Sequence, residues 1–162
     1  MSGMIEERLR KLGIELPSPS VPPAIYSPYH VYNGTVSISG QPPYWNGALM
    51  FTGKVGTTLT LEDGQRSARL SALNVLSHLK TACNGDLDRV TGCVRMLVLV
   101  NAAEEFTDVH RVADGASALL ANVFSHLPPP TRSSLGCSTL PMGIATEVEV
   151  TFTITTEQMI RH

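Results

Sequence analysis

Residues 146–154 alternate without a break between polar and apolar side chains, and they form the clearest strand pattern in the chain. The polar set is Glu147, Glu149, Thr151 and Thr153, and the apolar set is Val148, Val150, Phe152 and Ile154. A period of two residues places these sets on opposite faces of a strand. The pattern therefore predicts a sheet with one buried face, which a second layer must cover.

A second strand is predicted immediately upstream. Small and polar residues alternate between Arg132 and Thr139, after a proline run at 128–130. The sequence Leu-Pro-Met-Gly at 140–143 is typical of a turn, because proline fixes its own φ and glycine adopts positive φ without strain. We expect the two strands to form a hairpin that places Arg132 and Glu147 on adjoining strands.

Two long segments have the spacing of helices that bury one face. In residues 60–83, Thr60 can cap the helix with Asp63 at the third position after it, and small or branched residues recur three and four positions apart. A second helix is predicted at about 103–126, with an interruption near Val109 left open. The apolar side of each helix should pack on the same apolar face of the sheet.

The remaining strands are shorter or more apolar. Asn33-Gly34 predicts a tight turn between two strands within residues 29–41. A third strand is expected at 48–51, after a loop at 44–47. Residues 90–100 form an apolar run rich in β-branched side chains, long enough for a central strand buried on both faces. The element order indicates an α+β two-layer sandwich, with a mixed sheet and two long helices on one face.

The N-terminal part differs in composition from the rest. Within residues 1–16, the segment from Met4 to Leu12 is an amphipathic helix too short to be stable alone, so it must dock. Residues 17–28 hold five prolines and should form an extended connector. We expect a single domain at 29–156 and a C-terminal tail at 157–162.

Composition narrows the function classes. A net charge of −2 gives no basic footprint for nucleic acid. The three cysteines have no C-x-x-C spacing and the five histidines no ligand spacing, so we expect free thiols and no structural metal. No apolar run is long enough for secretion or a membrane span. We expect a soluble cytoplasmic protein without membrane contact, with a mitochondrial location left open.

Three short motifs, each present once, carry a resemblance to a known family. They are the V-S-I-S-G-Q of residues 36–41, Tyr26 at fourteen residues before Gly40, and R-S-S at 132–134 followed by L-P at 140–141 and E-V-E at 147–149. Together they resemble the YjgF/Rid family of reactive-intermediate deaminases, also called endoribonuclease L-PSP. The resemblance covers roughly residues 20–155.

The resemblance implies a chorismate-mutase-like fold and a homotrimer with sites in the clefts between neighbours. Independent support comes from the apolar content of the strands. Met96, Val98 and Val100, together with the Ser/Thr-rich residues 133–139, offer more sheet surface than two helices readily cover.

The resemblance also implies a reaction. It is the hydrolysis, without a cofactor, of 2-imino or enamine acids such as 2-aminoacrylate to 2-ketoacids and ammonia. Arg132 would hold the substrate carboxylate through a two-pronged hydrogen bond. Glu147 would orient water and transfer its proton.

The expected substrate-binding residues are Tyr26, Ser39, Gly40, Ser134 and Asp114. Of these, Ser134 stands where many members have a cysteine, and Asp114 roughly where an asparagine is common.

Other readings stay open at this level. Arg132 and Glu147 could be ordinary surface charges. Cleavage of single-stranded RNA is disfavoured by the mild acidity and by the lack of a histidine pair or a basic-aromatic stripe. A non-catalytic trimer that binds small carboxylates or a partner protein would need Arg132 but not Glu147. Tyr44 and Trp45 are candidates for a lid, or for a loop that packs on a neighbour.

Overall fold

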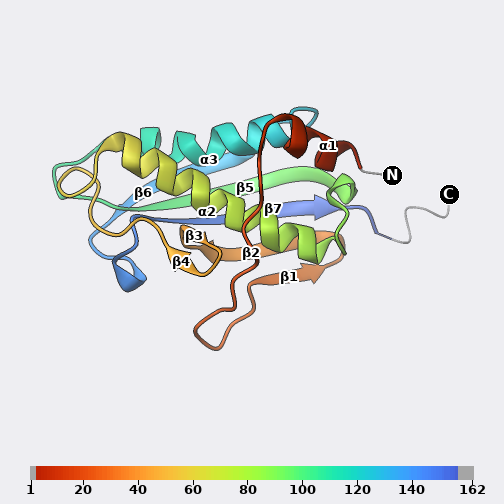
Figure 1. Cartoon of the computed structure of the whole chain (residues 1–162), viewed down its shortest axis with the longest axis horizontal. Helices are drawn as coiled ribbons and strands as arrows, with labels where there is room; N and C mark the ends of the chain where they lie inside the picture. The colour runs from red at the N-terminus through yellow and green to blue at the C-terminus, as the bar shows by residue number, and fades with distance from the viewer. Residues whose placement is uncertain (1–2, 157–162) are drawn as a thin grey trace.

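Two long helices lie side by side across one face of a five-stranded sheet in the computed structural model, which describes residues 3–156 (Figure 1). They are α2 (Leu61–Ala82) and α3 (Val109–Val123). The predicted capping box starts α2: Thr60 Oγ1 accepts from the Asp63 amide at 3.1 Å, and the Asp63 carboxylate accepts from the Thr60 amide at 3.0 Å. The α+β sandwich with both helices on one face is confirmed.

The sheet is mixed, and its last strand in sequence lies at its centre. Only one neighbouring pair, β5 with β6, is parallel, and α3 is the crossover between its strands. The other pairs are antiparallel. In spatial order the strands are β1 (Tyr29–Tyr32), β2 (Thr35–Gln41), β7 (Thr146–Ile154), β5 (Val90–Asn101) and β6 (Thr131–Cys137).

The predicted hairpin between β6 and β7 is wrong, because β5 lies between them. Arg132 is in register with Met96, whereas Glu147 is in register with Leu99. The apolar face of β7 is fully buried, which favours an interior place, while the half-polar β6 suits an edge. The link between them, residues 138–145, is also longer than a tight hairpin loop.

Two further boundaries differ from the predictions. Residues 44–49 form a small separate sheet of β3 (Tyr44–Trp45) and β4 (Ala48–Leu49), rather than a loop and a strand of the main sheet. Its turn is Asn46-Gly47, with φ of 48° and 87°, which is typical of a tight hairpin. The second helix begins only at Val109, so residues 103–108 lie outside it.

The core fills the space between the helices and one sheet face. Met96, Val98 and Val100 are fully buried in it. The expectation that they are surplus sheet surface is therefore wrong. The opposite face of β5 is not fully buried in the single chain: Leu97 and Leu99 are half-buried, and their neighbour Leu135 on β6 is exposed. The prediction of a strand buried on both faces is therefore wrong for one chain. The uncovered apolar surface lies on the other side of the sheet.

The N-terminal helix α1 (Met4–Lys11) docks as expected. The Asp88 carboxylate accepts from the amides of Met4 at 2.7 Å and Ile5 at 2.8 Å. Ile5 and Leu9 are buried. Beyond α1 the connector crosses α2, where Ser77 Oγ donates to the Pro17 carbonyl at 2.6 Å (Figure 1). The N-terminal segment thus lies along the domain on its way to β1.

The structure also bears on the predictions for cysteines, membrane spans, metal sites and the C-terminal tail. All three cysteines are free thiols, and Cys83 and Cys93 are buried. Within residues 3–156, no helix is long and apolar enough to cross a membrane, and no three metal-ligating side chains come together. The tail expected at 157–162 lies outside the described residues.

Candidate functional site

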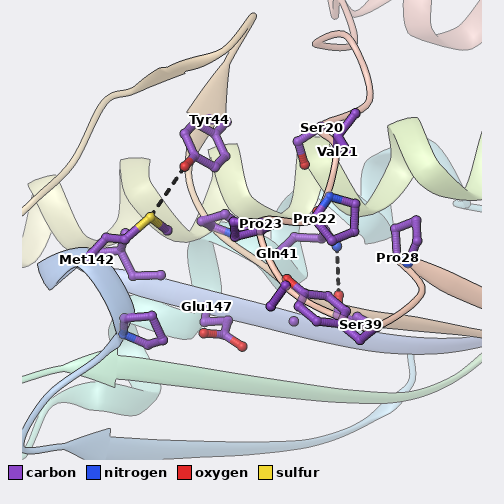
Figure 2. Close-up of a pocket in the computed structure, with 16 residues that line it drawn as sticks. Ser20, Val21, Pro22, Pro23, Pro28, Ser39, Gln41, Tyr44, Met142 and Glu147 are labelled. Atoms are coloured by element: carbon purple, nitrogen blue, oxygen red, sulfur yellow. Dashed lines mark hydrogen bonds between the residues drawn. The ribbon is translucent and has the colours of Figure 1, made fainter.

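A cavity of about 410 Å³ lies between the connector and the strands β2 and β7 (Figure 2). Its wall consists of residues 20–24, Tyr26 and Pro28 of the connector, residues 39–42 with Tyr44, and residues 141, 142 and 144 with Glu147. Four of the expected site residues, Tyr26, Ser39, Gly40 and Glu147, therefore meet in one place. The connector residues around Val21 were not predicted, because only the tertiary fold brings the connector to this point.

Glu147 packs directly against Gly40. A Cβ atom built on Gly40 would lie 1.9 Å from Glu147 Oε1. The strands make room here with a bulge, since Ile38 and Gln41 of β2 are in register with Val150 and Val148 of β7. The space that a side chain at Gly40 would fill is occupied by the Glu147 carboxyl.

The surroundings of Glu147 favour its protonated form. Burial raises the pKa of this carboxyl above its ordinary value, and the nearby Glu149 charge raises the pKa further. A raised pKa lies closer to neutral pH, where a carboxyl can both accept and return a proton. Glu147 is the only carboxyl among the described residues that line this cavity.

Ser39 and Gln41 fasten the cavity wall. Ser39 Oγ donates to the Ser27 carbonyl at 2.6 Å, and the Ser39 amide donates to the Pro28 carbonyl at 2.9 Å, which ties the connector to β2. Gln41 is 3% exposed, and its Nε2 donates to the Ser39 carbonyl at 2.9 Å. That bond fixes the amide orientation, and Gln41 Oε1 meets no donor within residues 3–156. Gln41 belongs to the S-G-Q motif, but the sequence assigned it no role.

A contact between two loops closes one side of the cavity. Tyr44 Oη donates to Met142 Sδ at 3.5 Å (Figure 2). Met142 has a φ of 58°, which is uncommon for a residue with a side chain. Tyr44 thus occupies the position expected of a lid residue. Trp45 packs against the hydrophobic core instead and does not line the cavity.

Arg132 lies in a second cluster with α3. Its Nη1 donates to Asp114 Oδ1 at 2.8 Å and to Ser117 Oγ at 2.9 Å, and its Nη2 donates to the His110 carbonyl at 3.1 Å. Arginine has five N–H donors. Its Nε–H and one Nη2 hydrogen find no acceptor in the described part of the chain, so two donors remain for a further acceptor. Asp114 and Ser117 therefore orient Arg132; Ser117 was not foreseen.

The two clusters lie apart in one chain. Arg132 shares its sheet face with the buried Met96 and packs on α3, whereas Glu147 shares the opposite face with Leu99. Arg132 and Asp114 line a separate groove of about 480 Å³. Ser134, two residues beyond Arg132 on β6, belongs to the same face as Arg132. The expectation that one hairpin combines Arg132 with Glu147 is wrong.

Comparison with known proteins agrees with this fold. Residues 6–147 match the family described as "YjgF/chorismate mutase-like, putative endoribonuclease". Protein TCP17 of Trypanosoma cruzi is 38% identical over 149 residues, which cover 91% of this chain and 92% of that protein.

Two crystal structures are similar over nearly the whole chain. Atu1372 of Agrobacterium tumefaciens, a protein of unknown function, has a TM-score of 0.87 at 33% identity and covers 95% of each chain. A "putative endoribonuclease" of Shewanella oneidensis has a TM-score of 0.90 at 29% identity and covers 94% of this chain and 100% of its own. The resemblance indicated by the three motifs is confirmed. The chain belongs to the YjgF/chorismate-mutase-like family.

Proposed function

We propose that this protein hydrolyses reactive 2-imino and enamine acids to 2-ketoacids and ammonia, at sites shared between neighbouring chains of a homotrimer. The observation that carries the proposal is the division of the expected site into two complementary halves. One half is an arginine with two N–H donors left over. The other is a cavity that contains a carboxyl of raised pKa and no lysine, arginine or histidine.

Each half supplies what the other lacks. Arg132 binds the substrate carboxylate and so fixes the C=N carbon in place. Glu147 takes a proton from water as the water oxygen bonds to that carbon, and it returns this proton to the nitrogen. A second proton passes from the hydroxyl of the resulting carbinolamine to its nitrogen as the C–N bond breaks, which releases ammonia and leaves the ketone. An enamine first becomes an imine as a proton moves from its nitrogen to its carbon. Both substrates arrive already activated, so no cofactor is needed.

The separation of the halves favours a ring of chains. The Arg132 and Glu147 surfaces are different patches of one chain, so a contact that joins them is head-to-tail, and repetition of such a contact closes a ring or grows a filament. The half-buried Leu97 and Leu99 and the exposed Leu135 on the uncovered sheet face provide apolar surface for such contacts. A closed ring of three chains has three equivalent sites.

Mixing two inactive variants tests the shared site. Arg132→Ala and Glu147→Gln should each be inactive, because every site lacks one half. Chains mixed in equal amounts during refolding should recover about a quarter of the wild-type activity, since each site draws one chain at random for each half. The control mixes Arg132→Ala with the double variant Arg132→Ala/Glu147→Gln, and it should recover nothing. A mixture that stays inactive would show that no site combines two chains.

The assay also separates the other functions. Imines are generated in place by an amino-acid oxidase, and ketoacid formation is measured above the uncatalysed rate. Wild type that binds ketoacids without turnover would be a binding module. Cleavage of single-stranded RNA that Glu147→Gln abolishes would favour the endoribonuclease reading. We expect no such cleavage, because the Glu147 and Glu149 carboxylates repel phosphate.

A further inference from the structure

We infer that the cavity beside Glu147 is a side-chain pocket, and that the preferred substrates are imino acids with branched or aromatic apolar side chains. This inference rests on the proposed function and adds the substrate class to it. Its basis is the chemistry and the size of the cavity wall.

The wall is mostly apolar and stiff. Val21, Pro22, Pro23 and Ala24 of the connector line one part, and Met142 and Ile144 line another. Figure 2 shows Pro22 and Pro23 of the connector above Glu147 in this view. Proline rings have fixed φ and lose little freedom when a ligand packs on them. An acidic side chain would lose hydration here without gaining a partner of opposite charge, because no lysine, arginine or histidine lines the cavity.

The cavity is larger than the smallest substrates require. A three-carbon imino acid has six non-hydrogen atoms and takes roughly 180 Å³, if each atom is given a water's share of about 30 Å³. That is less than half of the 410 Å³. On the same basis a leucine-derived imine takes roughly 270 Å³, a phenylalanine-derived one roughly 360 Å³, and a tryptophan-derived one roughly 450 Å³. The cavity thus has room for a whole imino acid up to the size of the phenylalanine-derived one.

The position of Glu147 sets the orientation of the substrate. With the C=N carbon near the Glu147 carboxyl and the carboxylate directed to Arg132 of a neighbouring chain, the side chain extends along the connector. The contact between Tyr44 and Met142 limits its length. The connector, which α1, Ser77 and Ser39 hold in place, thereby takes part in substrate selection.

The test is a substrate series. Imines are made by an amino-acid oxidase from alanine, 2-aminobutyrate, leucine, phenylalanine and tryptophan, and kcat/KM is measured for each. We expect kcat/KM to rise by up to about fourfold for each buried methylene, to peak at leucine or phenylalanine, and to fall at tryptophan. Equal values for alanine- and leucine-derived imines would overturn the side-chain pocket.

A pair of variants locates the selectivity. Ala24→Phe should fill the pocket and lower the ratio of kcat/KM for the leucine- and phenylalanine-derived imines to that for the alanine-derived imine at least tenfold. The matched control is Ile25→Phe, the next residue, which is fully exposed and does not line the cavity. Light scattering on both variants confirms that they assemble as wild type does. Equal selectivity changes in both variants would also overturn the proposal.

Ketoacid binding distinguishes the two proposals from each other. Calorimetric titration with pyruvate and with 4-methyl-2-oxopentanoate reports on the pocket without turnover. Tighter binding of the branched acid, lost in Ala24→Phe, together with no hydrolysis of any imine, would overturn the enzymatic function and keep the pocket. Hydrolysis of all imines at the same rate, with equal ketoacid affinities, would do the reverse.

Discussion

Gly40 is required by the side chain packed against it rather than by its own backbone. Its φ lies outside the left-handed region, yet a Cβ at this position would overlap Glu147 Oε1. We predict that Gly40→Ala displaces the Glu147 carboxyl and lowers kcat/KM by about 10²-fold, since a misplaced acid-base group loses most of its effect. Kinetics on the folded variant check this.

Stability measurements separate this clash from a general disturbance of the fold. The overlap should cost about 1–3 kcal/mol of unfolding free energy. Glu147→Ala, which removes the clashing carboxyl, should restore that stability when combined with Gly40→Ala, and activity should remain lost. Additive losses of stability would show that the two residues do not conflict.

The raised pKa of Glu147 predicts a pH-dependent stability difference. Folding favours the protonated form of a group whose folded-state pKa is raised. Its stabilising contribution is complete below the pKa of the unfolded chain and is lost as pH rises through the folded pKa. Glu147→Gln should therefore unfold at a higher temperature than wild type at pH 7–8. The difference should vanish near the ordinary glutamate pKa of about 4. Melting curves across this range decide it, and a constant difference would contradict the prediction.

Arg132 has more N–H donors than a lysine, and the proposed site uses all of them. Three of its donors bind Asp114, Ser117 and the His110 carbonyl, and two remain for a substrate. An ammonium group has only three donors and no planar edge. We predict that Arg132→Lys lowers kcat/KM by roughly 30- to 1,000-fold and leaves the fold intact. Wild-type turnover by this variant would exclude Arg132 from the site.

At the level of the elements, α2 and α3 touch at a glycine. A Cβ built on Gly115 would lie 2.1 Å from the Gln65 carbonyl oxygen of α2. Backbone cannot move aside as a flexible side chain can, so Gly115→Ala should separate the helices. We predict a loss of about 1–3 kcal/mol, or roughly 2–10 °C in the melting temperature. Gly136→Ala is the control, because its nearest neighbour would be at an ordinary 3.5 Å. Equal melting temperatures for the two variants would contradict the close contact.

Local sequence patterns predicted the helices and strands themselves better than they predicted which strands lie next to each other. The capping box at Thr60, the turn at Asn33-Gly34 and the alternation in β7 are each encoded within a few residues, and each matches the structure. The placement of β5 between β6 and β7 depends on contacts distant in sequence, so the apparent hairpin was misleading. The motifs pointed to Glu147, Gly40, Ser39 and Tyr26 as site residues. They did not indicate the connector that encloses these residues, because its position also depends on contacts distant in sequence. In the structure Arg132 also donates a hydrogen bond to Asp114, a contact that no motif describes.

The whole molecule should be a trimer of about 52 kDa, three times the 17.4 kDa chain. Light scattering coupled to size exclusion measures this mass directly. Leu135 is 53% exposed on the edge strand β6, and Leu135→Arg should release monomers, because burying an unpaired charge in an apolar contact is costly. These monomers should lack activity although Arg132 and Glu147 are unchanged. An active wild-type monomer would exclude a site shared between chains.

The central position of β7 has a consequence for synthesis on the ribosome. β7 is translated after the other four strands of the sheet, yet it separates β2 from β5, which have no other partner on those edges. Until Ile154 has left the exit tunnel, the nascent chain exposes two unpaired strand edges and an apolar sheet face. Such edges are where chains associate wrongly. This protein therefore completes its sheet only after β7 has emerged, and a chaperone that holds the nascent chain should engage it longest at β2 and β5.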